Sequence, residues 1–354
     1  MYRILLILFL SISLQFSSQI NTQLLSNSSW TRVKFSMLDG SRDLSQIPSQ
    51  FLIWKIKGNN LCSFTDALIL DKRSCMDFKL EKELMKTSDL AAYQIEKLTS
   101  DSLVVIQKVA GIDSPDKIRK MWFTKSSIVL NNLVKEKKKD SVIIASKNFT
   151  PALKRNIISE IFDNYSQKDF SHDFHLKGSI LIFPKKQKIE VETENLEQTK
   201  ASQKGIAFFK TTLEKNYHLW DLTGFENFEK IIIPYDITSK NGSLGNDINT
   251  IGILFFNVLN DTKGFPVSIK NKKLSLDNFD KGVDASNSNK FDKAIQFFNE
   301  AHEYDNTNTD ALYNIVSISL LQNKIDIACK TLKRLKDLEQ TEGMKLFKEK
   351  CLEK

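Results

Sequence analysis

The sequence has few of the residues from which catalytic and metal centres are built. Among 354 residues there are four histidines and four cysteines. There is no G-x-S-x-G elbow, no glycine-rich loop for phosphate and no neighbouring Cys–His pair. His172 and His175 have a spacing seen in metal sites but lack the glutamate of a zinc-protease helix, so we expect a structural or exposed pair. We therefore predict a non-enzymatic protein with no metal and no cofactor.

Clustered positive charge is also missing, although the net charge is +8 at pH 7. The lysine runs at residues 135–139 and 185–188 are short, and no aromatic side chains alternate with them as in a nucleic-acid groove. We interpret both runs as solvated loops and expect no nucleic-acid partner. With 41% hydrophobic and 27% charged residues, the composition is that of an ordinary globular protein.

Only one long apolar run occurs, and it lies at the N-terminus. Arg3 precedes the apolar residues 4–16, and residues 17–19 are small or polar, as at a cleavage site. The run is shorter than the roughly 20 residues that a membrane-spanning helix needs. We predict a signal peptide over residues 1–19, with an uncleaved anchor as the alternative. We expect an exported protein with no stable membrane span after signal removal.

The four cysteines form two close pairs along the chain. Cys62 and Cys75 lie near the front, and Cys329 and Cys351 lie near the end. Four cysteines allow three connectivities, and this clustering in an exported protein favours two local disulfides. A metal site is the alternative, but it would need a C-x₂-C pair or nearby histidines, and neither pair has them.

Short strands separated by turns are predicted from residue 30 to about residue 130. Their roughly ten-residue spacing favours an antiparallel barrel or sandwich. The segment resembles the lipocalin-like domains of bacterial envelope proteins: Trp30 opens the first strand, residues 93–99 lead into 103–105, and residues 116–119 precede Trp122 and Phe123. The resemblance implies a cup for a small apolar ligand. A packed interior without a pocket is the alternative.

The middle segment, residues 146–275, has an α-β-β-α-β pattern up to residue 238. We predict helices at 151–165 and 201–213 and strands at 176–183, 188–194 and 229–237. The order resembles the C-terminal domain of TonB-type proteins, with Lys177-Gly178-Ser179, Trp220 and Pro234 in the corresponding places. An energy transducer also needs a lasting anchor and a Pro-rich spacer, which this chain lacks. Beyond these elements, Asn241-Gly242 predicts a turn, residues 248–259 a helix or strand, and residues 267–276 a strand.

The C-terminal segment, residues 276–354, contains two stretches that superpose at a period of 34 residues. Ile325 and Leu335 in the second stretch correspond to Phe291 and Ala301 in the first. This is the tetratricopeptide length, and the segment resembles that family. We expect the repeat residues to pack antiparallel helices together; they are Phe291, Ala294, Phe298, Ala301, Ala328 and Leu332.

A closing helix is predicted after residue 343, where a Cys329–Cys351 bridge would staple the open end of the repeats. The family resemblance places Asn314 and Ser317 in a groove that binds a partner. His302 occupies a position where the repeat usually has leucine, so we interpret it as a packing residue rather than a ligand.

These predictions combine into a multi-domain α+β protein: an N-terminal antiparallel β-barrel or sandwich, a middle α+β domain and C-terminal α-hairpins. We expect it in the periplasm or at the outer envelope of a Gram-negative bacterium. The leading hypothesis is a non-enzymatic adaptor whose helical module binds an envelope protein or peptide segment. The alternatives are a carrier of a small apolar ligand in the N-terminal barrel and a structural part of an envelope complex.

Overall fold

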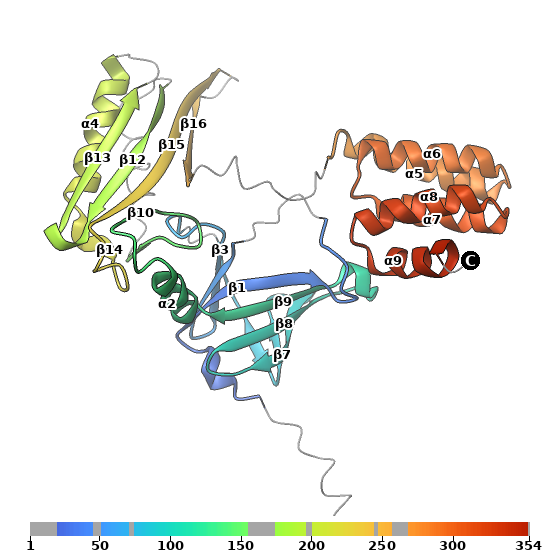
Figure 1. Cartoon of the computed structure of the whole chain (residues 1–354), viewed down its shortest axis with the longest axis horizontal. Helices are drawn as coiled ribbons and strands as arrows, with labels where there is room; N and C mark the ends of the chain where they lie inside the picture. The colour runs from blue at the N-terminus through green and yellow to red at the C-terminus, as the bar shows by residue number, and fades with distance from the viewer. Residues whose placement is uncertain are drawn as a thin grey trace, which may run out of the picture.

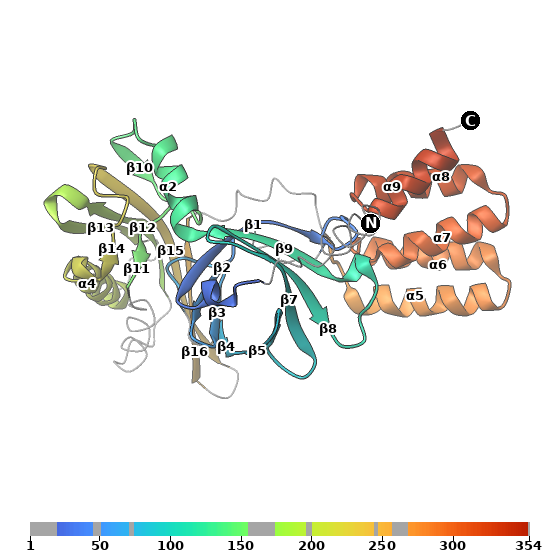
Figure 2. The same cartoon turned by 90° about the horizontal axis from the view of Figure 1, so that it is seen from below.

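The computed structural model describes residues 20–44, 51–70, 74–154, 174–195, 200–243, 247–256 and 268–352. The predicted signal peptide, residues 1–19, lies outside the described residues. The described chain forms a mixed α+β protein with a nearly closed nine-stranded antiparallel sheet, a second sheet and a group of helices. Figures 1 and 2 show the nine-stranded barrel between the second sheet on one side and the C-terminal helices on the other. The predicted α+β class with an N-terminal barrel is confirmed at this level.

The barrel is a single antiparallel sheet in the order β4-β3-β2-β1-β9-β8-β7-β6-β5. Its edge strands β4 and β5 are separated in sequence only by Phe78, so the two edges of the curled sheet meet. The strands are β1 (Ser28–Met37), β2 (Ile53–Lys57), β3 (Asn60–Phe64), β4 (Cys75–Asp77), β5 (Lys79–Glu81), β6 (Leu84–Lys86), β7 (Ala91–Leu98), β8 (Ser102–Val109) and β9 (Arg119–Lys125).

Alternation along these strands fills the barrel interior. Inward positions are occupied by aromatic and branched residues, which pack well on a pleated surface. Trp30, Trp54 and Phe123 are fully buried, and Trp54 stacks on Phe123 with ring centroids 4.5 Å apart. The short 3₁₀ segments η1 (Thr22–Leu25) and η3 (Pro115–Lys117) flank strands β1 and β9.

The second sheet carries the middle of the chain. Its order is β10-β15-β12-β13, with β16 paired to the far half of β15, and β10 runs parallel to β15. Helix α4 (Lys200–Glu214) packs on β12 and β13. The strands are β10 (Val142–Ile144), β12 (Phe174–Phe183), β13 (Lys188–Asn195), β15 (Lys230–Ser243) and β16 (Asp247–Phe255), and a separate pair is formed by β11 (Ala152–Leu153) and β14 (Trp220–Asp221). The 3₁₀ turns η4 (Pro184–Lys186) and η5 (Tyr217–Leu219) precede β13 and β14.

The strand predictions at 176–183, 188–194 and 229–237 agree with β12, β13 and the first part of β15, and the second predicted helix agrees with α4. The predicted helix at 151–165 is wrong at its start, because Ala152 and Leu153 pair with β14 as a strand. Its remainder, residues 155–165, lies outside the described residues. Trp220 is buried in this core, as expected.

Two predictions near the end of this unit are wrong. Asn241 and Gly242 lie inside β15 and pair with Asn249 and Ile248, so they do not form the predicted turn. The strand expected at 267–276 is also wrong, because helix α5 begins at Lys272. The Asn271 side chain accepts a hydrogen bond from the Leu274 amide at 3.0 Å and caps this helix. The sequence predicts a helix or a strand at 248–259, and residues 248–255 belong to strand β16.

Hydrophobic side chains from the barrel part of the chain pack against the core of the second sheet. Helix α2 (Ser126–Glu136) follows β9, and Leu130, Leu133 and Val134 pack against the core of the second sheet. Leu68, from the segment after β3, is fully buried in that same core. The two units therefore share hydrophobic packing.

Five successive helices form the C-terminal unit, and each packs on the next. Gly282 allows a close approach of α5 and α6, because a Cβ there would lie 2.7 Å from the Phe298 ring. The helices are α5 (Lys272–Asn287), α6 (Phe291–Tyr304), α7 (Thr309–Leu321), α8 (Ile325–Asp337) and α9 (Thr341–Phe347), followed by the π-helical turn η7 (Lys348–Leu352). No helix in the described ranges combines the length and apolar character that a membrane crossing needs.

The barrel is attached to this helical module. Leu44 is buried in the hydrophobic core of the helices. Arg42 pairs with Glu339 at 3.1 Å, and Lys117 pairs with Asp310 at 3.0 Å. These contacts hold one end of the barrel against the helices (Figure 2).

Candidate functional site

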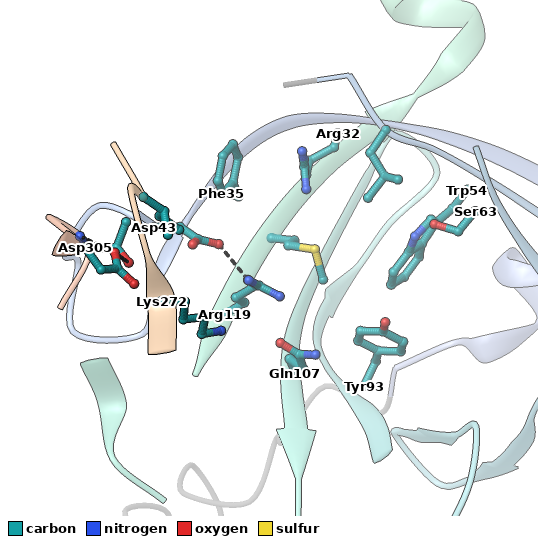
Figure 3. A pocket seen from close by; sticks show the side chains of 14 residues that line it. Arg32, Phe35, Asp43, Trp54, Ser63, Tyr93, Gln107, Arg119, Lys272 and Asp305 are labelled. Carbon is teal, nitrogen blue, oxygen red and sulfur yellow. Dashed lines mark hydrogen bonds and ion pairs between the residues drawn. The ribbon is translucent and has the colours of Figure 1, made fainter. Parts of the chain in front are cut away.

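The barrel is filled at one end and open at the other. Trp30, Leu103 and Phe123 close the filled end. Beyond Trp54 the interior widens into a cavity of about 760 Å³, which is bordered by the barrel strands and by residues around the start of α5 and the end of α6 (Figure 3). Its volume lies within the range of about 300–1,000 Å³ that is typical of small-molecule sites.

The inner wall of the cavity is aromatic and aliphatic. Trp54 on β2 and Tyr93 on β7 meet edge to face, with ring centroids 4.8 Å apart. Leu52, Met121 and Phe35 complete this surface. Because Trp54 is packed on its other side against Phe123, the wall is held in place by the barrel core.

Two arginines and an aspartate line the rim. Arg119 on β9 donates from Nε to Asp43 Oδ2 at 2.6 Å. The Asp43 side chain is only 4% exposed, whereas that of Arg119 is 40% exposed, so the carboxylate lies behind the guanidinium. Arg32 on β1 lies over the Phe35 ring, 4.3 Å from its centroid.

The position of Arg32 has a local cause. The β1–β9 register shifts between Arg32 and Lys34, which marks a β-bulge. A bulge re-aims the adjoining side chains, and here Arg32 borders the cavity while Lys34 lies over the Trp122 ring. The bulge thus places a cation at the barrel mouth.

Burial and neighbouring charges act on the titratable groups here. Burial lowers the pKa of Arg32; the Asp43 carboxylate opposes this effect and Arg119 adds to it. Burial also raises the pKa of Tyr93, and the Arg119 charge opposes that rise. Positive charge is therefore held in a partly desolvated space, where an added negative charge would be stabilised.

The helical module supplies the opposite rim. Asp305 Oδ1 accepts hydrogen bonds from the Thr307 amide at 2.9 Å and the Thr307 hydroxyl at 2.6 Å. Ile269 forms a backbone bridge with Asp305, and Lys272 is the first residue of α5. Ser63 and Gln107 add neutral hydrogen-bonding groups on the barrel side. The cavity thus joins an apolar wall to a rim that is mainly cationic.

Comparison with protein-family models, with curated proteins and with solved structures finds no match for this chain.

The predicted disulfides are both present. Cys62 and Cys75 are directly opposite each other on β3 and β4 and are bonded. Cys329 on α8 is bonded to Cys351 in η7, with a Cα–Cα distance of 5.7 Å. The clustering of cysteines along the chain therefore gave the correct connectivity.

The predicted repeat residues lie inside the helical module. Ala294, Phe298, Ala301, Ala328 and Leu332 are buried in its packing. Phe291 is half-buried and packs at the edge of the same core.

The two groove candidates lie one turn apart on α7, away from the cavity. Ser317 is exposed, whereas the Asn314 amide donates to the Asp310 carbonyl of its own helix at 2.9 Å.

Two histidines in the described residues, His175 and His302, make structural contacts. His175 Nε2 lies 2.7 Å from Asp236 Oδ1 on the neighbouring strand, while His172 lies outside the described residues. His302 is buried in the helical core, with Nδ1 3.2 Å from the Asn308 carbonyl oxygen. That environment agrees with the interpretation of His302 as a packing residue.

Sequence reasoning missed Arg32 and Arg119. The sequence signal for both is a charged residue at an inward position of a barrel strand. Arg119 lies two residues before the inward Met121, and Arg32 lies two residues after the inward Trp30, so each shares the inward face of its strand. Lys272, Asp305 and Thr307 had no comparable signal, because only the tertiary structure brings them to the barrel.

Proposed function

We propose that this protein binds and carries a small, largely apolar molecule in the mouth of its N-terminal barrel. One observation carries the proposal: the barrel core ends at Trp54, and beyond it lies a cavity with a preformed aromatic wall. A barrel serving only as scaffold would be filled throughout. Here the half-buried Tyr93 lines the cavity, together with Trp54 and Met121 at the boundary of the barrel core.

The test is to fill the cavity by mutation. Gln107→Trp places a large side chain into the space opposite Tyr93, whereas Lys108→Trp places the same side chain on the outer face of β8. Protein isolated under native conditions is extracted with organic solvent, and the released molecules are identified by mass spectrometry. We expect the same small molecule from the wild type and Lys108→Trp, and its loss from Gln107→Trp. Equal recovery from both variants, or none from the wild type, contradicts the proposal.

The compartment belongs to the same proposal. Two disulfides are typical of chains that fold in an oxidising environment. Together with the sequence pattern of residues 1–19, they support an exported carrier at the periplasm or outer envelope. In this proposal the barrel is the lipocalin-like domain, the second sheet belongs to the TonB-like domain, and helices α5–α9 form the tetratricopeptide-like domain.

A second candidate function is the adaptor, in which the helices bind an apolar segment of an envelope protein. It is favoured by two leucines that helix packing leaves outside the core: Leu276 on α5 is 53% exposed and Leu321 on α7 is 74% exposed. Ser317 lies one turn from Leu321 on the same helix. Leu276 lies near the start of α5 and Leu321 at the end of α7, so the two leucines would contact opposite ends of an apolar segment that lies along the helices.

The adaptor proposal is tested with Leu276→Asp/Leu321→Asp, using Leu90→Asp on the barrel surface as the matched control. Supporting evidence would be a partner that is captured by crosslinking, binds the purified wild type and Leu90→Asp directly, and fails to bind the double variant. Equal binding to all three proteins contradicts the adaptor groove.

A further inference from the structure

Positive side chains converge on the open end of the barrel from both units that border the cavity. Arg32 and Arg119 come from the barrel, and Lys272 comes from the first turn of α5 (Figure 3). The rim also contains the carboxylates of Asp43 and Asp305. Three cations thus face two carboxylates, which leaves an excess of positive charge where an apolar cavity opens.

The two carboxylates are already engaged. Asp305 accepts two hydrogen bonds from Thr307 and so stabilises its own turn. Asp43 is buried behind Arg119 and accepts from its Nε. That bond uses one of the five donors of the Arg119 guanidinium, so the half-exposed side chain can bind a second oxyanion from the cavity side.

We propose that the carried molecule has a carboxylate head group on an apolar body, and that the head group lies between the barrel and α5, facing Arg32, Arg119 and Lys272. This inference rests on the proposed carrier function. The apolar body lies against Trp54, Tyr93 and Met121. Guanidinium groups suit a carboxylate because their planar donors match its two oxygens.

The position of the head group has a consequence beyond the barrel. Because Lys272 belongs to the helical module, the bound molecule contacts both units. Lys272 should therefore contribute to carboxylate binding, although it lies on a helix outside the barrel.

The test compares three probes that share one alkyl chain: decanoate, 1-decanol and decyltrimethylammonium. Each is titrated into the full chain by calorimetry. We expect decanoate to bind at least about tenfold more tightly than decanol, because hydrogen bonds to charged groups are the stronger class. The ammonium probe should bind most weakly, because it places a positive charge beside three others.

Variants then locate the head group. Asp43→Asn/Arg119→Gln removes both charges of this ion pair, so it takes away the Arg119 guanidinium without leaving the buried Asp43 carboxylate unpaired. Lys272→Gln changes an exposed side chain, so this variant should fold as the wild type does. Lys120→Gln and Lys273→Gln remove the neighbouring positive charges outside the cavity as controls. We expect the first two variants to lose most of the preference for decanoate over decanol, and the controls to keep it.

The outcomes separate this inference from the carrier function. Decanol or the ammonium probe binding as tightly as decanoate would overturn the carboxylate head group and leave the carrier function intact. Binding of none of the three probes would overturn both. An unchanged decanoate preference in Lys272→Gln would overturn the placement of the head group between the two units.

Discussion

At the scale of the residue, polar groups inside this protein are held by specific partners. His302 is the clearest case, because it is buried on α6 with Nδ1 3.2 Å from the Asn308 carbonyl oxygen and with the opposing charges of Arg334 and Asp305 acting on it. Desolvation by burial lowers the pKa of His302 to about 4, from an ordinary value of 6.5. The neutral imidazole is therefore part of the folded state.

This environment predicts a pH dependence of stability. Between pH 6.5 and about 4 the unfolded chain binds a proton at His302 that the folded chain does not. The free energy of unfolding should therefore fall as the pH falls through this window, by on the order of 3 kcal/mol from this residue. Urea unfolding across the window should show a shallower dependence for His302→Leu than for the wild type. Exposed His218→Gln is the control, and equal slopes for wild type and His302→Leu would contradict the account.

At the scale of the element, the ends of the helical array need support that the helix interiors do not. Helices α6, α7 and α8 each have neighbours in the array, whereas α9 packs chiefly on α8. The Cys329–Cys351 bond ties the turn after α9 back to α8. The bond therefore secures the last element of the chain.

Removing this bond has a local and a global consequence. Cys329→Ser/Cys351→Ser should lower the free energy of unfolding by about 3 kcal/mol, because the closed loop spans 22 residues. Amide hydrogen exchange should rise mainly in α9 and η7, where the tether is lost. Cys62→Ser/Cys75→Ser is the matched control and should leave exchange in α9 unchanged. Unaltered α9 exchange in the first variant would show that packing alone holds this end.

The elements predicted from sequence were those whose side chains repeat regularly. The alternation at Ile189 and Val191 identified β13, and the 34-residue spacing of Ala294 and Ala328 identified the helical hairpins. The failures came where tertiary pairing overrode a local signal. Asn241-Gly242 favours a turn, but nine consecutive pairs with β16 keep that stretch extended.

At the scale of the whole molecule, the barrel and the helices are joined by the buried Leu44, by exposed ion pairs and by hydrogen bonds between residues 41–42 and 339–341. Leu44 enters the helical core, whereas the Lys117–Asp310 pair is half-exposed on both sides. Exposed ion pairs contribute little to stability, while a buried leucine contributes several kcal/mol. Leu44 should therefore contribute more to this attachment than the ion pairs do.

The contributions of Leu44 and of the Lys117–Asp310 ion pair can be compared by calorimetry. Leu44→Ala should destabilise the helical module by about 2–5 kcal/mol, seen as an earlier melting transition. Lys117→Gln should change the free energy of unfolding by less than about 1 kcal/mol. An effect of Lys117→Gln as large as that of Leu44→Ala would contradict this ranking.

The cavity could not be predicted at this scale from the sequence. Its rim brings together residues near positions 32, 43, 119, 272 and 305, which belong to distant parts of the chain. A strand pattern reports which side chains face inward, but it does not report where the core ends. The depth of the cavity is set by Trp54, and the helical rim by the docking of Leu44.

The most direct test of the carrier account is nuclear magnetic resonance of the full chain titrated with decanoate. The account predicts that shifts concentrate on Tyr93, Gln107 and Met121 inside the barrel and on Ile269 and Lys272 across the rim. Shifts confined to the exposed leucine faces of α5 and α7, or no saturable shifts, would contradict it.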